Sequence, residues 1–261
     1  MNYFDKEERI INFFQTLKRH EVYIYPKNIK TFKLYKLIHS KKLWKNWINT
    51  SGKSDPPPDY YNNSNKMMID VMRIDDHSFV NDTGNTINLH NRRESEIISE
   101  LSKKNPALKE AADEGRILII PDSGLRGDQD HNYDYYVHNF KRVIGKHIEK
   151  IPLYQQYHPD FKTIFFVFDE SSPYMVSLDG KRPTEVGELF YADPHFWWAD
   201  ANMLNVLKNS KVDYLIWFSP FKHFDSVEKF EMCKAIIYDL SRFEFENLVI
   251  YNAKDMFSAE L

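Results

Sequence analysis

Short, uninterrupted apolar segments in the second half of the chain constrain its fold more than any other feature. The clearest are Thr163–Phe168 (TIFFVF) and Asp213–Phe218. A strand that is apolar along its whole length needs cover on both faces, as in the sheets of α/β proteins. Two further strands are expected at Arg116–Ile120 and Asn247–Tyr251, and helices at Tyr133–Lys150, Ala201–Lys208 and Val227–Ser241. The sequence therefore predicts an α/β fold with a mixed sheet flanked by helices.

The first part of the chain is predicted to be mainly helical. Apolar residues recur at helical spacing over Asp5–Arg19 and again over Lys30–Asn49, as one or two amphipathic helices. Other expected elements are strands at Val22–Tyr25 and Met67–Ile74 and helices at Glu94–Lys104 and Pro106–Gly115. Residues 1–54 hold too few strands for a sheet of their own. We therefore expect a single α/β domain over residues 1–261, with residues 1–54 as a mostly helical, basic portion packed on it.

Composition excludes several classes of protein. Hydrophobic residues make up 42% and aromatic residues 15% of the chain, which is enough for a sizeable core and atypical of a disordered protein. The longest apolar runs are far shorter than the roughly 20 residues that cross a bilayer, so no membrane partner is expected. The N-terminal residues are charged where a signal peptide is apolar, and Cys233 is the single cysteine, so no intrachain disulfide forms. A cytoplasmic protein is expected, and its oligomeric state is left open.

The charge is unevenly distributed along the chain. Between Lys18 and Ser54 there are ten Lys or Arg residues and one acid, a net charge of +9, so the rest of the chain carries −12 to reach the overall −3. Such asymmetry indicates an anionic partner, often DNA or RNA, and the alternative is a solvated lysine-rich face. The lysines that would bind nucleic acid are Lys30, Lys33, Lys41 and Lys45, between apolar residues expected to face the core.

Two acids on either side of a predicted turn are the most informative candidates for chemistry. Asp59 follows Pro58, and Asp70 lies 11 residues later, inside the strand predicted at Met67–Ile74. A hairpin of this layout brings two carboxylates together at one end of a sheet. Paired carboxylates offer the hard oxygen ligands that Mg²⁺ and Mn²⁺ prefer, and such a metal activates water and stabilises a phosphoryl transition state. We expect the two carboxylates about 4–6 Å apart, close enough to share one cation.

This stretch resembles the PD-(D/E)xK nuclease-like superfamily. The resemblance covers about residues 5–75 and implies that Asp59 and Asp70 hold a catalytic Mg²⁺. It also implies a carboxylate from the preceding helix, Glu7 or Glu8, of which we assign Glu8. The function implied is that of a Mg²⁺-dependent phosphodiesterase, a nuclease acting on DNA or RNA.

The chain departs from the family pattern at the lysine position, which Met72 occupies. Lys66 is about 13 Å from Asp70 along the strand, and Arg73 points to the face of the strand opposite to Asp70, so neither residue replaces that lysine. Cleavage is therefore expected to be impaired or absent. A noncatalytic protein that binds nucleic acid or a protein partner is the alternative from another class.

Three other groups of residues are weaker candidates. Asp169 and Glu170 follow the strand Thr163–Phe168, where open α/β sheets bind ligands, and imply a small-molecule enzyme unless Asp169 serves as a cap. The polar segment Asp75-Asp76-His77, with His90 and Arg92-Arg93-Glu94, is either a metal or phosphate site or a solvated loop. The aromatic clusters at 193–200 and 217–224 either stack on bases or close the core.

Overall fold

The computed structural model describes residue 4 and residues 6–52, 58–80, 86–113, 131–182, 191–222 and 233–259. Its centre is a seven-stranded mixed sheet, so the α/β fold expected from the sequence is confirmed. In sheet order the strands are β1 (Val22–Tyr25), β11 (Ala235–Asp239), β10 (Tyr214–Phe218), β7 (Lys162–Asp169), β4 (Met67–Ile74), β3 (Tyr60–Asn62) and β2 (Ile48–Asn49).

The sheet combines a parallel centre with antiparallel additions. Strands β4, β7 and β10 are parallel neighbours, and β11 runs antiparallel to β10 and parallel to β1. At the other end, β2, β3 and β4 form an antiparallel meander. Parallel neighbours need a long crossover, which the chain between β4 and β7 supplies with helix α6 (Tyr133–Tyr157).

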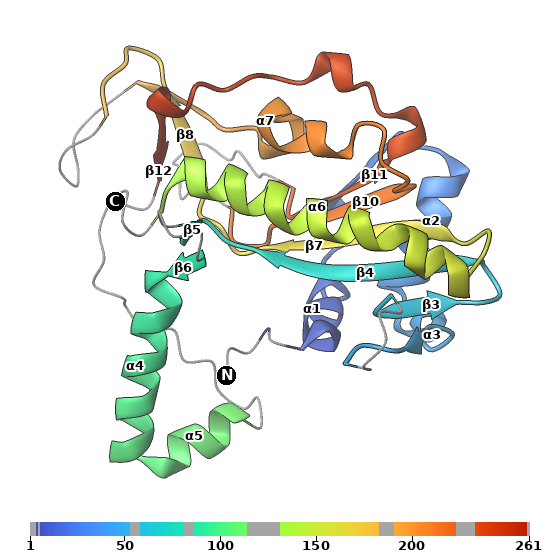
Figure 1. Ribbon diagram of the computed structural model, residues 1–261, viewed down its shortest axis with the longest axis horizontal. Helices are drawn as coiled ribbons and strands as arrows, with labels where there is room; N and C mark the ends of the chain where they lie inside the picture. Colours follow the sequence, from blue (N-terminus) through green and yellow to red (C-terminus); the bar gives the residue numbers. More distant parts are fainter. Residues whose placement is uncertain are drawn as a thin grey trace.

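Helices cover both faces of the sheet, as the apolar strands require (Figure 1). One layer contains α1 (Glu7–Phe14), α2 (Ile29–His39) and α3 (Lys41–Trp44), and the other contains α6 and α7 (Ala201–Leu204). The side chains of β7 alternate between two cores: Phe166 packs toward α1 and α2, whereas Phe165 packs toward α6.

Smaller elements surround the sheet. A second sheet has the order β12 (Met256–Ser258), β8 (Tyr174–Ser177), β9 (Ala192–Pro194). The hairpin of β5 (Ser78–Val80) and β6 (Thr86–Asn88) leads into α4 (Leu89–Lys104) and α5 (Pro106–Asp113), which extend away from the sheet (Figure 1). Single 3-10 turns lie at Arg19–Glu21, Trp197–Ala199, Asn205–Leu207, Leu240–Arg242, Phe245–Asn247 and Ala253–Asp255.

Two predictions about the C-terminal region are wrong. The helix expected at Val227–Ser241 contains the strand β11, because Ala235–Asp239 is a fully buried run that pairs with β1 and β10. The strand expected at Asn247–Tyr251 is absent: Val249 makes an isolated bridge to Asp200, and the last strand is β12. A short apolar run fits either periodicity, and tertiary pairing decides between them. The strand expected at Arg116–Ile120 lies outside the described residues.

The long helix α6 shows how the second layer is built. It continues beyond the expected end, through Pro152, to Tyr157, and Asn132 caps its first turn by accepting a hydrogen bond from the Tyr135 N–H at 3.2 Å. In the described part of the chain, no helix has the length and apolar character needed to cross a membrane.

Candidate functional site

The antiparallel pairing of β3 and β4 brings the two predicted acids together. Tyr60 pairs with Ile69, so extending the register by one residue sets Asp59 opposite Asp70. Directly opposite residues of an antiparallel pair have Cβ atoms about 4.5–5.5 Å apart on one face of the sheet. The hairpin alone therefore produces a pair of facing carboxylates.

Each carboxylate is fixed by hydrogen bonds from a different element. Asp59 Oδ2 accepts the backbone N–H of Val71 at 2.7 Å. Asp70, which is 4% exposed, accepts at Oδ2 from His147 Nδ1 at 2.5 Å and from the Tyr154 hydroxyl at 2.9 Å. His147 and Tyr154 both lie on α6, so that helix orients the acid on the strand beneath it.

The closeness of the acids changes the ionisation of Asp59. Burial raises the pKa of Asp59 to about 8, and the negative charges of Asp70 and Glu7 add to the rise, against the lowering effect of the Val71 N–H. With no cation present, the Asp59 carboxyl therefore keeps its proton near neutral pH. Two like charges this close are stable together only beside a compensating positive charge.

A cavity of about 270 Å³ adjoins the carboxylates at the edge of β4. Its lining comes from both helical layers and from the strand: Phe4, Glu7, Ile10, Val71, Met72, Arg73, Val143 and His147. Neither aspartate lines it, but each is hydrogen-bonded to a residue that does, Asp59 to Val71 and Asp70 to His147. We call Asp59, Asp70, Glu7 and His147 the edge site.

The helix carboxylate of the edge site is Glu7, whereas the sequence assignment was Glu8. On α1 the buried stripe is Ile10, Ile11 and Phe14, and Glu7 lies one turn before it on the same side. Glu7 accordingly lines the cavity and acts on the pKa of Asp59. Glu8 is exposed and is not among the cavity-lining residues.

No lysine occupies the position that the family pattern requires. Met72 is 3% exposed and packs in the core under α6. Lys66 is exposed, in the turn that joins β3 to β4, and Arg73 pairs with Glu170, with Nη2 and Oε2 2.6 Å apart. The imidazole of His147 borders the cavity beside Asp70.

The basic segment has the two-sided character expected of it. In α2 and α3 the residues Leu34, Leu37 and Ile38 are buried, as is Trp47 just beyond α3. All four candidate lysines are exposed: Lys30, Lys33, Lys41 and Lys45. The chain passes from α3 through β2 to Thr50, whose N–H donates to the Asp59 carbonyl at 2.8 Å. Thr50, within the basic segment, therefore lies beside the edge site.

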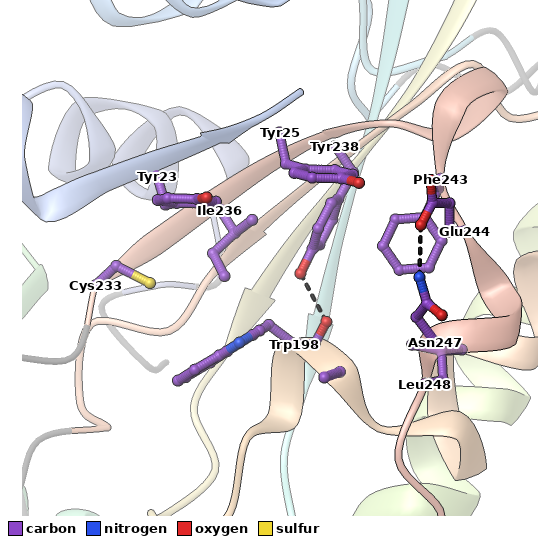
Figure 2. A pocket seen from close by; sticks show the side chains of 11 residues that line it. Tyr23, Tyr25, Trp198, Cys233, Ile236, Tyr238, Phe243, Glu244, Asn247 and Leu248 are labelled. Atoms are coloured by element: carbon purple, nitrogen blue, oxygen red, sulfur yellow. Dashed lines mark hydrogen bonds between the residues drawn. The ribbon is translucent and has the colours of Figure 1, made fainter. Parts of the chain in front are cut away.

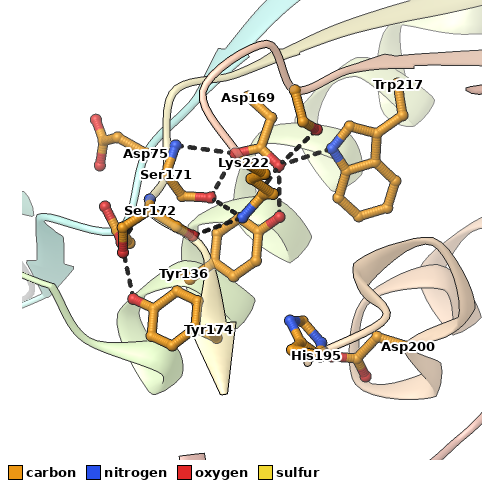
Figure 3. Close-up of polar contacts among 12 residues, drawn as sticks. Asp75, Tyr136, Asp169, Ser171, Ser172, Tyr174, His195, Asp200, Trp217 and Lys222 are labelled. Atoms are coloured by element: carbon orange, nitrogen blue, oxygen red, sulfur yellow. Dashed lines mark hydrogen bonds and ion pairs between the residues drawn. The ribbon is translucent and has the colours of Figure 1, made fainter. Parts of the chain in front are cut away.

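Asp169, one of the two acids expected to form a small-molecule site, belongs to a buried polar network (Figure 3). The Asp169 carboxylate accepts from Tyr136 at 2.5 Å and Trp217 at 2.9 Å, and Lys222 Nζ lies 3.8 Å away. Lys222, 2% exposed, also donates to Ser171 Oγ at 2.6 Å. We call Tyr136, Asp169, Ser171, Ser172 and Lys222 the buried network.

Glu170 does not join Asp169 in this network, because its carboxylate pairs with Arg73. Burial raises the pKa of Glu170 to about 6, although Arg73 acts in the opposite sense. The two adjacent acids therefore have different partners, as neighbouring residues at the end of a strand usually do.

An apolar cavity of about 350 Å³ lies at the other edge of the sheet, on β1 and β11 (Figure 2). Aromatic side chains surround it, including Tyr23, Trp198 and Tyr238, whose hydroxyl donates to the Trp198 carbonyl at 2.7 Å. None of its lining residues belongs to β7. This cavity therefore gives no support to a small-molecule site at Asp169 and Glu170.

The remaining candidates from the sequence have different environments: the arginines are on the surface, and the aromatic residues are in the core. Arg92 and Arg93 pair with Glu96 on the exposed side of α4. Of the aromatic segments, Trp197 and Trp217 are fully buried and pack against each other in the core. The side chains of His90 and Glu94 lie outside the described part of the structure.

Asp76 and His77, by contrast, lie in a tight polar cluster with His131. Burial by itself raises the pKa of Asp76, but the hydrogen bond and charge of His131, with His77 and Lys222, hold it well below its usual value.

Sequence reasoning missed two residues that hold Asp70 in place. His147 and Tyr154 occupy the apolar stripe of α6, at the helical positions that continue from Phe140, Ile144 and Ile151. A polar side chain in such a stripe needs a buried partner, which is the signal that points to them. No family model, curated protein or solved structure matches this chain.

Proposed function

We propose that this protein is a Mg²⁺-dependent phosphodiesterase of the nuclease type that acts on nucleic acid. The observation that carries the proposal is the close approach of the Asp59 and Asp70 carboxylates where the chain enters β3 beside β4. A pair of facing carboxylates with a third, Glu7, nearby is an oxygen-rich donor set of the kind that divalent cations with hard character occupy.

The residues of the edge site fit a magnesium ion. Asp59 and Asp70 would hold it, and Glu7 would contribute from α1, directly or through water. The raised pKa of Asp59 supports the fit, because a cation that displaces the proton relieves the repulsion between the two acids. Without a cation, burial of that carboxyl favours its neutral form.

The chemistry divides between the metal and the chain. When bound, Mg²⁺ supplies a water of lowered pKa and stabilises negative charge on the phosphate. Asp70 orients the His147 ring through the contact with Nδ1. His147 borders the cavity and can move a proton there, a role that the family pattern gives to lysine. With Met72 at the lysine position, slow cleavage is expected.

The exposed lysines support nucleic acid as the substrate. Lys41 and Lys45 belong to the segment that leads into β2, whose partner strand β3 begins next to Asp59. A polyanion held there by its phosphates passes close to the edge site. Phosphate contacts position a strand without reading its sequence, so DNA and RNA are both candidate substrates.

The test is a cleavage assay with Asp70→Asn and a matched control. Labelled single- and double-stranded DNA and RNA are incubated with the full chain in Mg²⁺, Mn²⁺ or EDTA. We expect metal-dependent cleavage that Asp70→Asn abolishes and that Asp179→Asn, a change of an exposed aspartate after β8, leaves intact. Equal cleavage by wild type and Asp70→Asn contradicts the proposal.

The absence of the lysine favours a second candidate, a protein that binds nucleic acid without cutting it. In that case the wild type binds labelled DNA or RNA in the presence of Mg²⁺, the substrate stays intact over hours, and Asp70→Asn binds equally well. Cleavage and binding are measured on the same samples, so the two candidates give different results.

A further inference from the structure

Asp76 is a buried carboxylate with two very different oxygens. It follows β4 and has no exposed surface. Its Oδ2 accepts hydrogen bonds from Ser172 N and Oγ, at 3.1 and 2.9 Å, from the Tyr174 hydroxyl at 2.8 Å and from His131 Nδ1 at 3.0 Å. Its Oδ1 has no hydrogen-bond partner among the described residues, and His77 Nε2 lies 3.6 Å from it.

Two imidazoles lie beside the Asp76 carboxylate, His77 near Oδ1 and His131 at Oδ2. His77 is the next residue after Asp76, and His131 lies just before the N-cap of α6. The two rings have centroids 4.8 Å apart, and one ligand atom from each of Asp76, His77 and His131 lies within 4.8 Å of the others. The Asn132 N–H donates to the Asp76 carbonyl at 3.3 Å, which ties the start of α6 to the end of β4.

A buried carboxylate oxygen that accepts no hydrogen bond is costly. A buried polar atom without a hydrogen bond has lost its contacts with water and gained none in return, and the penalty is greater when the atom is charged. A buried polar atom without a protein partner indicates that a water or an ion binds beside it. Because two imidazoles converge on the same place, a bound metal ion accounts for all three side chains at once.

We propose that Asp76, His77 and His131 bind a divalent transition-metal ion such as Zn²⁺. Ligand atoms 2.0–2.2 Å from zinc in tetrahedral geometry are about 3.3–3.6 Å apart, close to the separation of Asp76 Oδ1 and His77 Nε2. Three protein ligands leave a fourth position for water or a further ligand, as in catalytic zinc sites. The two histidines are partly accessible, with side chains 11% and 13% exposed, so the ion has a route in.

The Asp–His cluster selects a different metal from the edge site. Imidazole ligands suit zinc, cobalt and other first-row transition metals, whereas magnesium takes carboxylates and water. The two sites are also separate along β4. Asp76 comes six residues after Asp70, about 20 Å along an extended strand. The inference therefore does not depend on the proposed nuclease activity.

The experiment titrates metal-stripped full-length protein with Co²⁺ and Zn²⁺ alone. Co²⁺ is followed by its visible absorption, and Zn²⁺ by calorimetry. With millimolar Mg²⁺ present to occupy the edge site, we expect one equivalent to bind, with X-ray absorption showing nitrogen and oxygen ligands at about 2.0–2.1 Å. Loss of an outer-shell partner usually weakens a metal site by 10–100-fold, so His77→Ala or His131→Ala, which removes a direct ligand, should weaken it at least as much.

Two controls keep the outcome decisive. The first is His138→Ala, which removes an exposed histidine of α6 and should bind Co²⁺ as the wild type does. Circular dichroism and thermal melting verify that the histidine variants are folded. No saturable binding by the wild type, or unchanged binding by folded His77→Ala and His131→Ala, overturns the proposal.

Discussion

The edge site and the buried network each hold a buried aspartate of the central sheet, Asp70 on β4 and Asp169 on β7, yet they treat the negative charge in opposite ways. In the buried network, hydroxyls, an indole N–H and the Lys222 ammonium surround Asp169. In the edge site, Asp59 faces Asp70 and Glu7, and the pKa of Asp59 rises to about 8 because of burial and those charges. Acids saturated by donors stabilise a fold, whereas acids left facing each other beside a cavity are suited to bind a cation.

The largest expected effect is on the cleavage rate, and it tests whether the edge site is catalytic. If His147 transfers a proton in the edge site, His147→Gln should lower the cleavage rate by about 10²–10⁴-fold, the usual contribution of a general acid or base. The Kd for Mg²⁺, measured by calorimetry, should stay nearly unchanged, because the carboxylates remain. A parallel loss of Mg²⁺ binding and cleavage would mean that His147 only positions Asp70.

The next largest effect is on stability, and it tests whether the buried network stabilises the fold. Lys222→Met leaves the Asp169 carboxylate in the buried network without its cation, and breaking a buried pair this way typically costs about 3–5 kcal/mol. For a chain of this size, that lowers the Tm by about 6–20 °C in thermal melting. The double variant Lys222→Met/Asp169→Asn should recover part of the loss. If Lys222→Met lowers the free energy of unfolding by less than about 1 kcal/mol, the buried network does not stabilise the fold as proposed.

The contrast also explains how far the sequence could be interpreted. The strand β4 has the predicted bounds, Met67–Ile74, because eight mostly apolar residues lie between clear turn signals. The spacing of Asp59 and Asp70 depends only on a local hairpin, so their opposition could be predicted from the residues. Contacts between residues that are close in the sequence, such as those of this hairpin, can therefore be predicted from the sequence alone.

Features that depend on distant segments were out of reach. His147 meets Asp70 across 77 residues of chain, and Asp169 meets Lys222 through a crossover of strands. The apolar run Ala235–Asp239 fits a helix as well as a strand. It forms a strand because it pairs with β1, more than 200 residues away along the chain, and the local sequence does not reveal that pairing. The choice of Glu7 over Glu8 depends on how α1 lies against the sheet.

A third prediction concerns pH and the metal-free edge site. The pKa of Asp59 is about 8 in the folded protein and about 3.9 when unfolded. Between these values the folded state binds more protons, so the free energy of unfolding should fall as the pH rises from about 4 to 8. Asp70 and Glu7 act on the pKa of Asp59, the hydroxyls of Tyr60 and Tyr154 also interact with its charge, and His147 contacts Asp70.

Asp59→Asn removes that dependence while keeping an oxygen that can accept the Val71 N–H. At pH 8 to 9 the variant should melt about 2–4 °C above the wild type, equivalent to about 1 kcal/mol for a protein of this size. Millimolar Mg²⁺ should stabilise the wild type and not the variant. Asp179→Asn serves as the control. A variant less stable than the wild type at pH 9 would mean that the acids of the edge site do not repel each other.

The smallest effect on stability, and the sharpest on binding, concerns the lysines of α2 and α3. Because Lys30, Lys33, Lys41 and Lys45 are exposed while Leu34 and Ile38 are buried, replacing two of the lysines with glutamate should cost under about 0.5 kcal/mol of stability. Nucleic-acid binding should weaken, and the slope of log K against log salt should fall in magnitude by about 0.9 per lost phosphate contact on duplex DNA, or 0.7 on single strands.

The matched control for these lysines is Lys103→Glu/Lys104→Glu at the end of α4, which makes the same change in net charge on an exposed helix away from the sheet. If binding depends on overall charge alone, both double variants weaken it equally. If α2 and α3 hold the phosphate backbone, only their variants flatten the salt slope. Unchanged slopes in fluorescence anisotropy titrations with both variants would leave the basic segment as a solvated face, and the edge site would then need a substrate other than nucleic acid.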